Sequence, residues 1–301
     1  MVPSSEAAKR RLRRVARRLG FELGRPGGRL LPVGVRPLAL PPSVDVGAIR
    51  RGHSVSIDIR RLVTPYGFSY ADGGWHPYWS TVRAYLAGTA THAESSPLTE
   101  YFDRFQPTSA NEVLFPGQEV ELAALTALAP RDVSVIWTVS ARDHRALARQ
   151  HRSGSGPRAG RPNYNIGPAS PDVIRDVFER LVRITKSLQQ HGYRPHEFRG
   201  GVVEGFFLIA GDDYRFVPTE GQHRLGALRA LGFDEVQVMP RYGLTGVRSA
   251  QLDRWTRPHG GPYSADEVRL IFERFFEVRP CPWSDVELPR DRQPSRPYAG
   301  A

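Results

Sequence analysis

The chain has 301 residues, of which 40% are hydrophobic, and a formal net charge of +11. This length allows a sizeable core, in one large domain or two small ones. No apolar run approaches the ~20 residues of a membrane-spanning helix, and no apolar signal-peptide segment follows the basic N-terminus. The single cysteine, Cys281, excludes an internal disulfide and fits a reducing compartment, so we expect a cytoplasmic protein.

The positive charge is almost entirely arginine, because Lys9 and Lys186 are the only lysines. Such a skew can come from the base composition of a genome as well as from a polyanionic partner. Net charge alone therefore does not identify what the protein binds.

Residues 5–19 concentrate the positive charge and predict a basic amphipathic helix with a narrow apolar stripe. Its basic face suits an anionic membrane surface or a nucleic acid, or it is simply a solvated helix face. Residues 24–42 are rich in Gly and Pro and predict a linker, so we assign 1–45 to helix and linker. The basic residues of this helix are Lys9, Arg10, Arg11, Arg13, Arg14, Arg17 and Arg18.

Residues 54–59 alternate polar and apolar side chains, which predicts a strand. A segment dense in aromatic residues and glycine follows at 67–79, with His76 in its middle, and 78–86 predict a helix. Two interpretations of this segment stay open. His76 is an acid–base group of a built pocket, or the aromatic residues are core anchors and His76 is satisfied locally.

The stretch from 68 to 165 predicts mostly short helices, with one strand expected over 133–139. A long helix is then expected from Ser170, an N-cap residue followed by Pro171, to the glycine at 192. The buried face of this helix is predicted to carry Ile174, Val177, Phe178, Leu181, Ile184 and Leu188.

Residues 200–241 predict a strand, a tight turn at 211–213, a second strand, a short helix and a third strand. The helix is expected to start at Gly221 and to end before Gly232. Glycine at a helix start lets a ligand approach the backbone closely, and the first turn presents unpaired N–H groups at its positive end. His223 and Arg224 add donors there, so this is a candidate phosphate site, or else an ordinary turn before a solvated helix end.

The hairpin, the run EGQHRLGALRALG and the strand after it resemble the ParB/sulfiredoxin superfamily, over roughly residues 165–241. The resemblance implies an α/β (α+β) fold with a single core of this type at 46–245, a mostly helical insertion at 68–165 and a basic N-terminal helix. In this family the box at 221–224 holds nucleotide phosphates. It is therefore implied to do so here through Gly221, Gln222, His223 and Arg224.

Two departures from the family bear on the chemistry. Gln222 stands where sulfiredoxins have their reactive cysteine, and Gln222 and His223 stand where ParB proteins have a Glu-Arg pair. We therefore expect neither sulfinic-acid reduction nor CTP switching. The resemblance further implies phosphate contacts from Arg60 and Arg61, in the loop after the first strand. Lys186 of the long helix either reaches a phosphate or is a solvated lysine.

Three carboxylates are candidates for the chemistry of the box. Glu204 lies in an otherwise apolar strand, where an ionised side chain is costly unless it is paired. Glu220 directly precedes Gly221, and Asp58 ends the first strand. Phosphoryl transfer needs positioning and charge neutralisation, so one of these groups would hold Mg²⁺ or accept a hydroxyl proton.

The C-terminal part begins with Ser264 and Glu267, which form a capping-box pattern ahead of an apolar helical face. We expect a helical extension at 246–287 and a disordered tail at 288–301. No helix-turn-helix pattern follows the box, which argues against a sequence-specific DNA-binding partition protein.

These features lead to a hypothesis of a nucleotide-binding protein that acts as an ATP- or ADP-dependent, kinase-like phosphotransferase on a small hydroxylated acceptor, with Mg²⁺. The candidate catalytic residues are Glu220, Glu204, Asp58 and His76. The alternative is a non-enzymatic ParB-like module that binds a nucleotide or a nucleic acid. A third interpretation is a scaffold in which the box only connects strand to helix.

Overall fold

The computed structural model describes residues 21–22, 31–32, 41, 54–137, 141–154, 164–197, 201–240 and 246–281. The chain divides into two compact units, Met1–Leu38 and Ala39–Ala301. In the first unit, strand β1 (Phe21–Glu22) pairs antiparallel with β2 (Leu31–Pro32). The expected basic helix at 5–19 and the tail at 288–301 lie outside the described residues.

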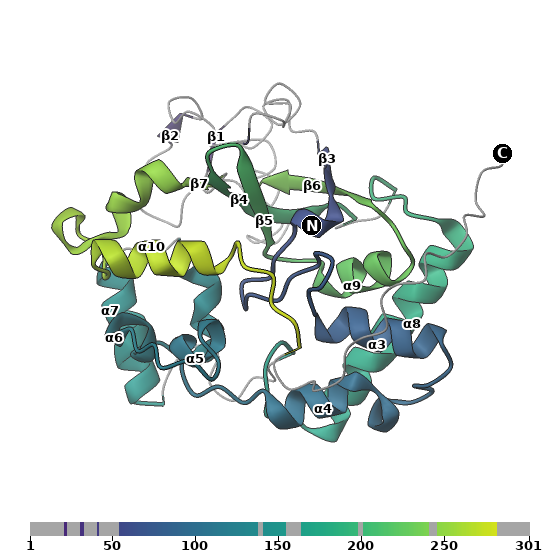
Figure 1. Cartoon of the computed structure of the whole chain (residues 1–301). Coiled ribbons are helices and arrows are strands. Elements are labelled where there is room, and N and C mark those ends of the chain that lie inside the picture. Colours follow the sequence, from purple (N-terminus) through teal and green to yellow (C-terminus); the bar gives the residue numbers. More distant parts are fainter. Residues whose placement is uncertain are drawn as a thin grey trace, which may run out of the picture. The chain divides into compact units, whose positions relative to one another are not determined.

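The second unit contains a mixed five-stranded sheet, so the predicted mixed α/β class is correct (Figure 1). Its central strand is β4 (Val203–Ala210), which forms the expected hairpin with β5 (Asp213–Pro218). On the other side, β6 (Glu235–Pro240) runs parallel to the first part of β4, and β7 (Gly246–Arg248) to the second part. The edge strand β3 (Val55–Asp58) pairs antiparallel with β6.

The sheet curls so that its two edges approach each other. After β3 the chain makes one 3₁₀ turn, η1 (Ile59–Arg61), and Leu62 then pairs beside Phe216 of β5, at the opposite edge. Four residues span at most ~14 Å, whereas four strand spacings across a flat sheet amount to about 19 Å. The N–H of Val63 donates to the carbonyl of Phe216 at 3.1 Å, which fixes this crossing.

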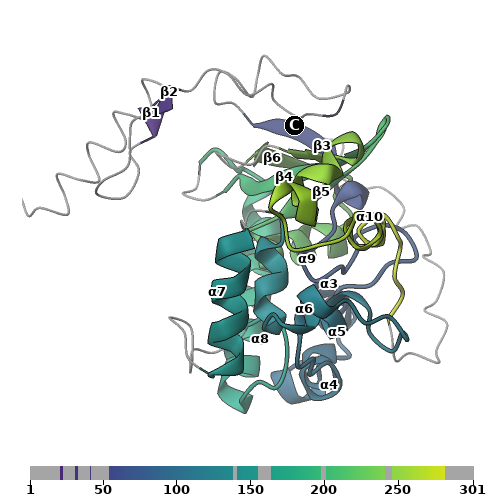
Figure 2. The same cartoon turned by 90° about the vertical axis from the view of Figure 1, so that its left-hand side faces the viewer.

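Three helices pack together on one side of the sheet: α3 (Pro77–Leu86), α8 (Pro171–His191) and α9 (Gln222–Ala230) (Figures 1 and 2). The predicted signals of α8 are correct, since Ser170 Oγ accepts from the N–H of Val173 and Gly192 closes the helix with a φ of 71°. α9 lies close against α3 at Gly226. A Cβ at Gly226 would come within 2.8 Å of the Cβ of Tyr78.

The segment between α3 and α8 is helical, as expected, except at the strand predicted over 133–139. This prediction is wrong: residues Pro130–Val135 form the 3₁₀ helix η3. Val133 and Ile136 are both buried, and their spacing of three suits the three residues per turn of a 3₁₀ helix. The other helices of this segment are η2 (Ala93–Ser95), α4 (Pro97–Arg104), α5 (Ala110–Leu114), α6 (Ala123–Thr126) and α7 (Ala141–Arg152).

The C-terminal part consists of η4 (Ser249–Trp255), η5 (Arg257–His259) and α10 (Ala265–Arg274). The predicted capping box of α10 is present, with Ser264 and Glu267 bonded reciprocally. One apolar core joins side chains of α8, α10 and the helical segment to the sheet residues Phe206, Leu208 and Val217. No helix in the described part of the chain is both long and apolar enough to cross a membrane.

After α10 the chain runs back over the core, held by Arg279. The guanidinium of Arg279 donates to three backbone carbonyls, those of Gly67 at 2.9 Å, Leu114 at 3.0 Å and Tyr66 at 3.3 Å. Gly67 has a φ of 78°, and a Cβ there would overlap this guanidinium. The contact joins the C-terminal segment to the loop after β3 and to α5.

Candidate functional site

The start of α9 is built around Gly221. This residue is the N-cap and has left-handed backbone angles, with φ 85° and ψ 9°, a conformation that favours glycine. No side chain caps the helix at this end. The N–H groups of the first turn are therefore available to a ligand, and the positive end of the helix dipole lies at the same place.

Arg224 provides a cation beside this turn that no carboxylate of the described residues neutralises. Its Nη1 donates to the carbonyl of Gly201 at 2.6 Å, and among the described residues no carboxylate forms an ion pair with it. Two other partly buried arginines do have one: Arg215 pairs with Asp213, and Arg229 with Asp72. Burial lowers the pKa of Arg224, opposed by Tyr193 and assisted by the nearby charge of Arg180.

His223 lies in the first turn of α9 and packs on α3. Its imidazole stacks on the ring of Tyr78, with centroids 4.5 Å apart and planes 20° apart. Its Nε2 is buried and has no hydrogen-bond partner. Burial first, and then the charge of Arg180, lower the pKa of His223 from 6.5 to about 4. His223 is therefore neutral at pH 7.

Arg180 is a residue of this site that the sequence analysis did not assign to it. It is an exposed residue of α8, and its charge acts on both His223 and Arg224. The sequence did hold a signal for this position. Arg180 directly precedes the buried Leu181 and so lies at the border of the apolar face by which α8 packs on α9. The basic residue of α8 that the sequence offers as a possible phosphate contact, or as a solvated lysine, is Lys186.

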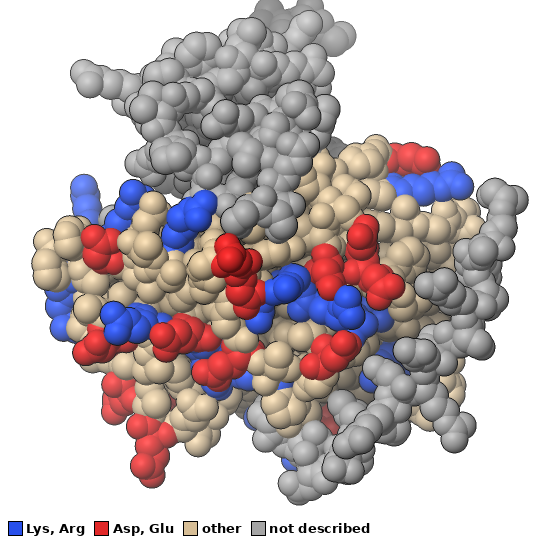
Figure 3. All heavy atoms as spheres, turned by 45° about the horizontal axis from the view of Figure 1, so that its top comes forward, with Lys and Arg blue, Asp and Glu red and all other residues tan. Residues whose placement is uncertain are grey.

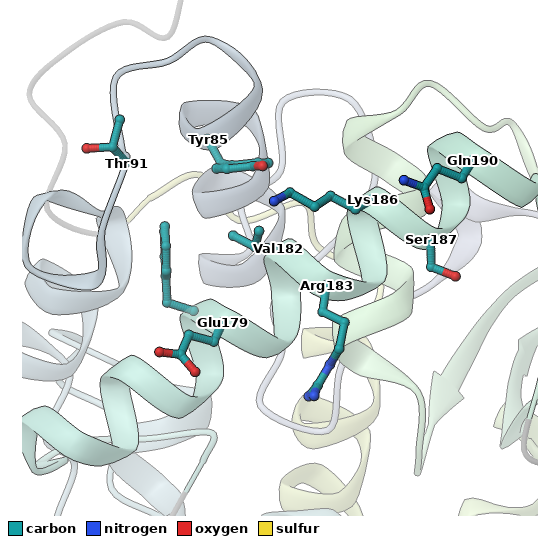
Figure 4. Close-up of a pocket in the computed structure, with 9 residues that line it drawn as sticks. Tyr85, Thr91, Glu179, Val182, Arg183, Lys186, Ser187 and Gln190 are labelled. Carbon is teal, nitrogen blue, oxygen red and sulfur yellow. The ribbon is translucent and has the colours of Figure 1, made fainter.

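Lys186 lines a separate surface groove with a volume of about 540 Å³ (Figure 4). The groove runs along α8 and also includes Tyr85, Val182 and Gln190. Lys186 points toward Tyr85 in this groove. Arg183 also lines the groove, and no residue of α9 does. The structure does not bring Lys186 to the start of α9.

His76 sits at the start of α3 as its N-cap. Its Nδ1 accepts the N–H of Tyr78 at 3.0 Å, and its ring stacks on Tyr70 with centroids 4.8 Å apart. The side chain is 1% exposed, and burial, followed by the influence of His223, lowers its pKa to about 3. This geometry matches the interpretation of a locally satisfied core histidine, and it does not place His76 before a substrate.

Asp58, Arg60 and Arg61 lie away from Gly221. Asp58 caps η1, accepting from the N–H and the guanidinium of Arg60. Burial acts to raise the pKa of Asp58, but the hydrogen bonds and the charge of Arg60 outweigh it and the pKa is lowered. The next residue, Ile59, bonds to the carbonyl of Asp234, beyond the C-terminal end of α9.

The ion pairs of Arg60 and Arg61 also place these two residues away from Gly221. Arg60 also lies 3.9 Å from Asp72, the partner of Arg229 in the last turn of α9. The nine residues of α9 rise by about 13 Å, so this cluster and Gly221 are at opposite ends of the helix. Arg61 pairs with Asp213 at the turn between β4 and β5.

Glu204 and Glu220 are both exposed. The expected cost of an ionised Glu204 in an apolar strand therefore does not arise. Val203 faces Gly221, with a Cγ atom 3.4 Å from the place of a Cβ there, so the period of a strand puts Glu204 on the opposite face. Glu220 directly precedes Gly221 and is the candidate carboxylate nearest the box in the chain.

The surface charge elsewhere adds no further concentration of one sign on the face in Figure 3, where described acidic and basic side chains alternate. Most of the net charge of +11 lies in residues 1–53, which hold twelve Lys or Arg and three Asp or Glu. Among the described residues, no group of three or more His, Cys, Asp or Glu could hold a metal ion. Glu220 would have to hold Mg²⁺ together with ligand phosphates.

Comparison of the chain with protein-family models, with curated proteins and with solved structures finds no match.

Proposed function

We propose that this chain is a nucleotide-binding protein with a ParB/sulfiredoxin-like core, whose phosphate site is the first turn of α9. One observation carries the proposal. An uncapped helix start with a left-handed glycine stands next to Arg224 and Arg180, and neither arginine has a carboxylate partner among the described residues. Backbone N–H groups, a helix dipole and guanidinium groups are the combination that binds phosphate.

The availability of the donors supports phosphate as the ligand. Arg224 uses Nη1 on the carbonyl of Gly201. Its Nη2 and Nε have no hydrogen-bond partner among the described residues, so these donors can contact phosphate oxygens. A Cβ at Gly221 would lie 3.4 Å from Val203 and 3.9 Å from Nη1 of Arg224, so the backbone of Gly221 adjoins the guanidinium. A phosphate group has several oxygens and accepts from several of these donors at once.

Phosphotransferase chemistry rests on fewer groups than the sequence suggested. Asp58 and Arg60 lie at the other end of α9, and Glu204 lies on the other face of β4, so Glu220 is left to hold Mg²⁺ or to accept a hydroxyl proton. ATP or ADP would supply the phosphoryl group, and the acceptor would be a small hydroxylated molecule.

The non-enzymatic alternative is favoured by the same separation of the carboxylates. Binding without turnover would need only the groups around Gly221. The two candidates differ in one observable. A transferase with Glu220 as its carboxylate consumes nucleotide when Mg²⁺ and an acceptor are present, and Glu220→Gln removes this turnover while leaving nucleotide binding intact.

The proposal is tested by measuring the binding of ATP, ADP, CTP and GTP in the presence of Mg²⁺, with calorimetry and thermal unfolding as the two methods of detection. We expect at least one nucleotide to stabilise the wild-type protein at millimolar concentration. If no nucleotide binds, the proposed function is wrong.

A further inference from the structure

His223 has a hydrogen-bonding atom that the folded chain leaves unused. Its Nε2 is buried without a partner, although the imidazole is held in place by its stack on Tyr78. A buried polar atom without a partner is uncommon and calls for an explanation. The neighbouring His76 shows the contrast, because its Nδ1 accepts the N–H of Tyr78.

The groups around His223 are neutral or positive. α3 contributes the rings of Tyr78 and His76, α8 contributes Arg180, and α9 contributes Arg224. No carboxylate is among the groups that act on the titration of His223. In the unliganded protein a protonated imidazole would therefore place a further positive charge beside Arg180, Arg224 and the positive end of the α9 dipole.

A bound dianion reverses this balance. An opposite charge within ~4–6 Å shifts the titration of a group by about one to three pKa units. That is comparable with the lowering of the pKa of His223 from 6.5 to about 4 in the free protein. The anion that neutralises Arg224 and Arg180 thus also offsets the penalty that burial, and secondarily the charge of Arg180, place on the imidazolium.

We propose that His223 takes up a proton when a dianionic phosphate or sulfate group binds at the first turn of α9, so that the affinity of this site rises as the pH falls. This inference rests on the proposed function and specifies how the phosphate site is regulated. It also specifies the ligand: a dianion is favoured over a monoanion such as acetate, because the site then holds three cationic groups.

The probe for this inference is inorganic sulfate. Sulfate remains a dianion throughout the range in which histidine titrates, so a pH dependence of its binding comes from the protein. With the titration of bound His223 raised by about two units, the sulfate affinity of the wild type is expected to rise about tenfold between about pH 8 and pH 5. Calorimetry in two buffers of different ionisation enthalpy would show uptake of about one proton near pH 5.

The variant His223→Gln is expected to show no rise in sulfate affinity between pH 8 and pH 5, whatever its affinity at pH 8. The matched control is His191→Gln, at the exposed C-terminal end of α8, which should keep the tenfold rise. An NMR titration of the wild-type histidines with and without sulfate gives the same answer without a substitution at position 223, with one histidine titrating higher when sulfate is bound.

The outcomes separate the inference from the proposed function. Sulfate or nucleotide binding with equal pH dependence in wild type and His223→Gln overturns the inference and leaves the phosphate site standing. Absence of any anion binding by the wild type at every pH overturns both. Equal affinity for acetate and sulfate at pH 5 contradicts the preference for a dianion.

Discussion

The imidazole of His223 and the phenol ring of Tyr78 lie face to face, with centroids 4.5 Å apart, across the contact between α9 and α3. Gly226, one turn further along α9, permits this contact because any side chain there would meet the backbone of α3. The proposed phosphate site therefore packs on a helix that lies some 140 residues earlier in the chain. This contact fixes the position of the His223 ring in the first turn of α9.

The stack predicts different effects for two substitutions of Tyr78. Tyr78→Phe keeps the ring on His223 but removes the hydroxyl that donates to the carbonyl of Tyr164. We expect stability to fall by about 1 kcal/mol, with ligand affinity within about twofold of the wild type, because no binding group moves. Tyr78→Leu should weaken phosphate binding as well. Chemical denaturation and calorimetry on both variants check this, and equal affinity losses for Phe and Leu would contradict the support by stacking.

The contact between Gly67 and Arg279 predicts an unequal effect of two glycine substitutions. Gly67 and Gly232 both have positive φ, 78° and 80°, but only at Gly67 would a Cβ overlap a neighbouring group, the guanidinium of Arg279. Gly232→Ala should cost about 1 kcal/mol for the backbone alone. Gly67→Ala should cost at least about 3 kcal/mol, because Arg279 must also leave its buried carbonyl partners.

Urea unfolding of the two glycine variants measures this difference. Equal losses of stability would mean that Arg279 moves aside without cost, and that the C-terminal segment is not fixed by this contact.

The buried histidines predict that the unliganded protein loses stability as the pH falls. The pKa values of His223 and His76 in the folded protein, about 4 and about 3, lie below their ordinary value of 6.5. The unfolded chain therefore binds more protons below pH 6.5 than the folded one. Their contribution to stability is complete above pH 6.5 and decreases down to pH 4 for His223 and pH 3 for His76.

For His223 the expected loss between about pH 7.5 and pH 5 is roughly 2 kcal/mol. Unfolding free energies measured at both pH values should therefore differ less in His223→Gln than in the wild type. The control is His196→Gln, an exposed histidine, which should keep the wild-type difference. If His223→Gln keeps it too, the imidazole of His223 is not held neutral by the fold.

Local signals in the sequence predicted the elements that form the site. The hairpin of β4 and β5, the glycine start of α9, and the capping residues of α8 and α10 all follow from turn and cap chemistry within a few residues. The prediction of a strand over 133–139 is wrong because a short apolar run does not distinguish a strand from a helix by its period. The 3₁₀ helix η3 buries Val133 and Ile136, which are three residues apart.

Which residues come together at the candidate site was harder to predict, because this depends on contacts between segments that are distant in the sequence. Asp58 ends β3 and Arg60 follows it, and the pairing of Asp58 with Glu235 at the start of β6 places them at the far end of α9. Arg180 and Lys186 are six residues apart on α8, and only the packing of α8 on α9 selects Arg180. The stack of Tyr78 on His223 needs the close approach at Gly226, whose partner the sequence does not identify.

The measurement that tests the account most directly is the dissociation constant of ATP or ADP with Mg²⁺, compared among the wild type, Arg224→Ala and Arg183→Ala. Arg183 is the matched control, since it is an exposed arginine of α8 that lines the separate groove with Lys186. We expect Arg224→Ala to weaken binding at least tenfold, in line with the loss of a charge-assisted contact, and Arg183→Ala to leave it unchanged. Equal affinities in all three proteins would contradict the assignment of the phosphate site to the start of α9.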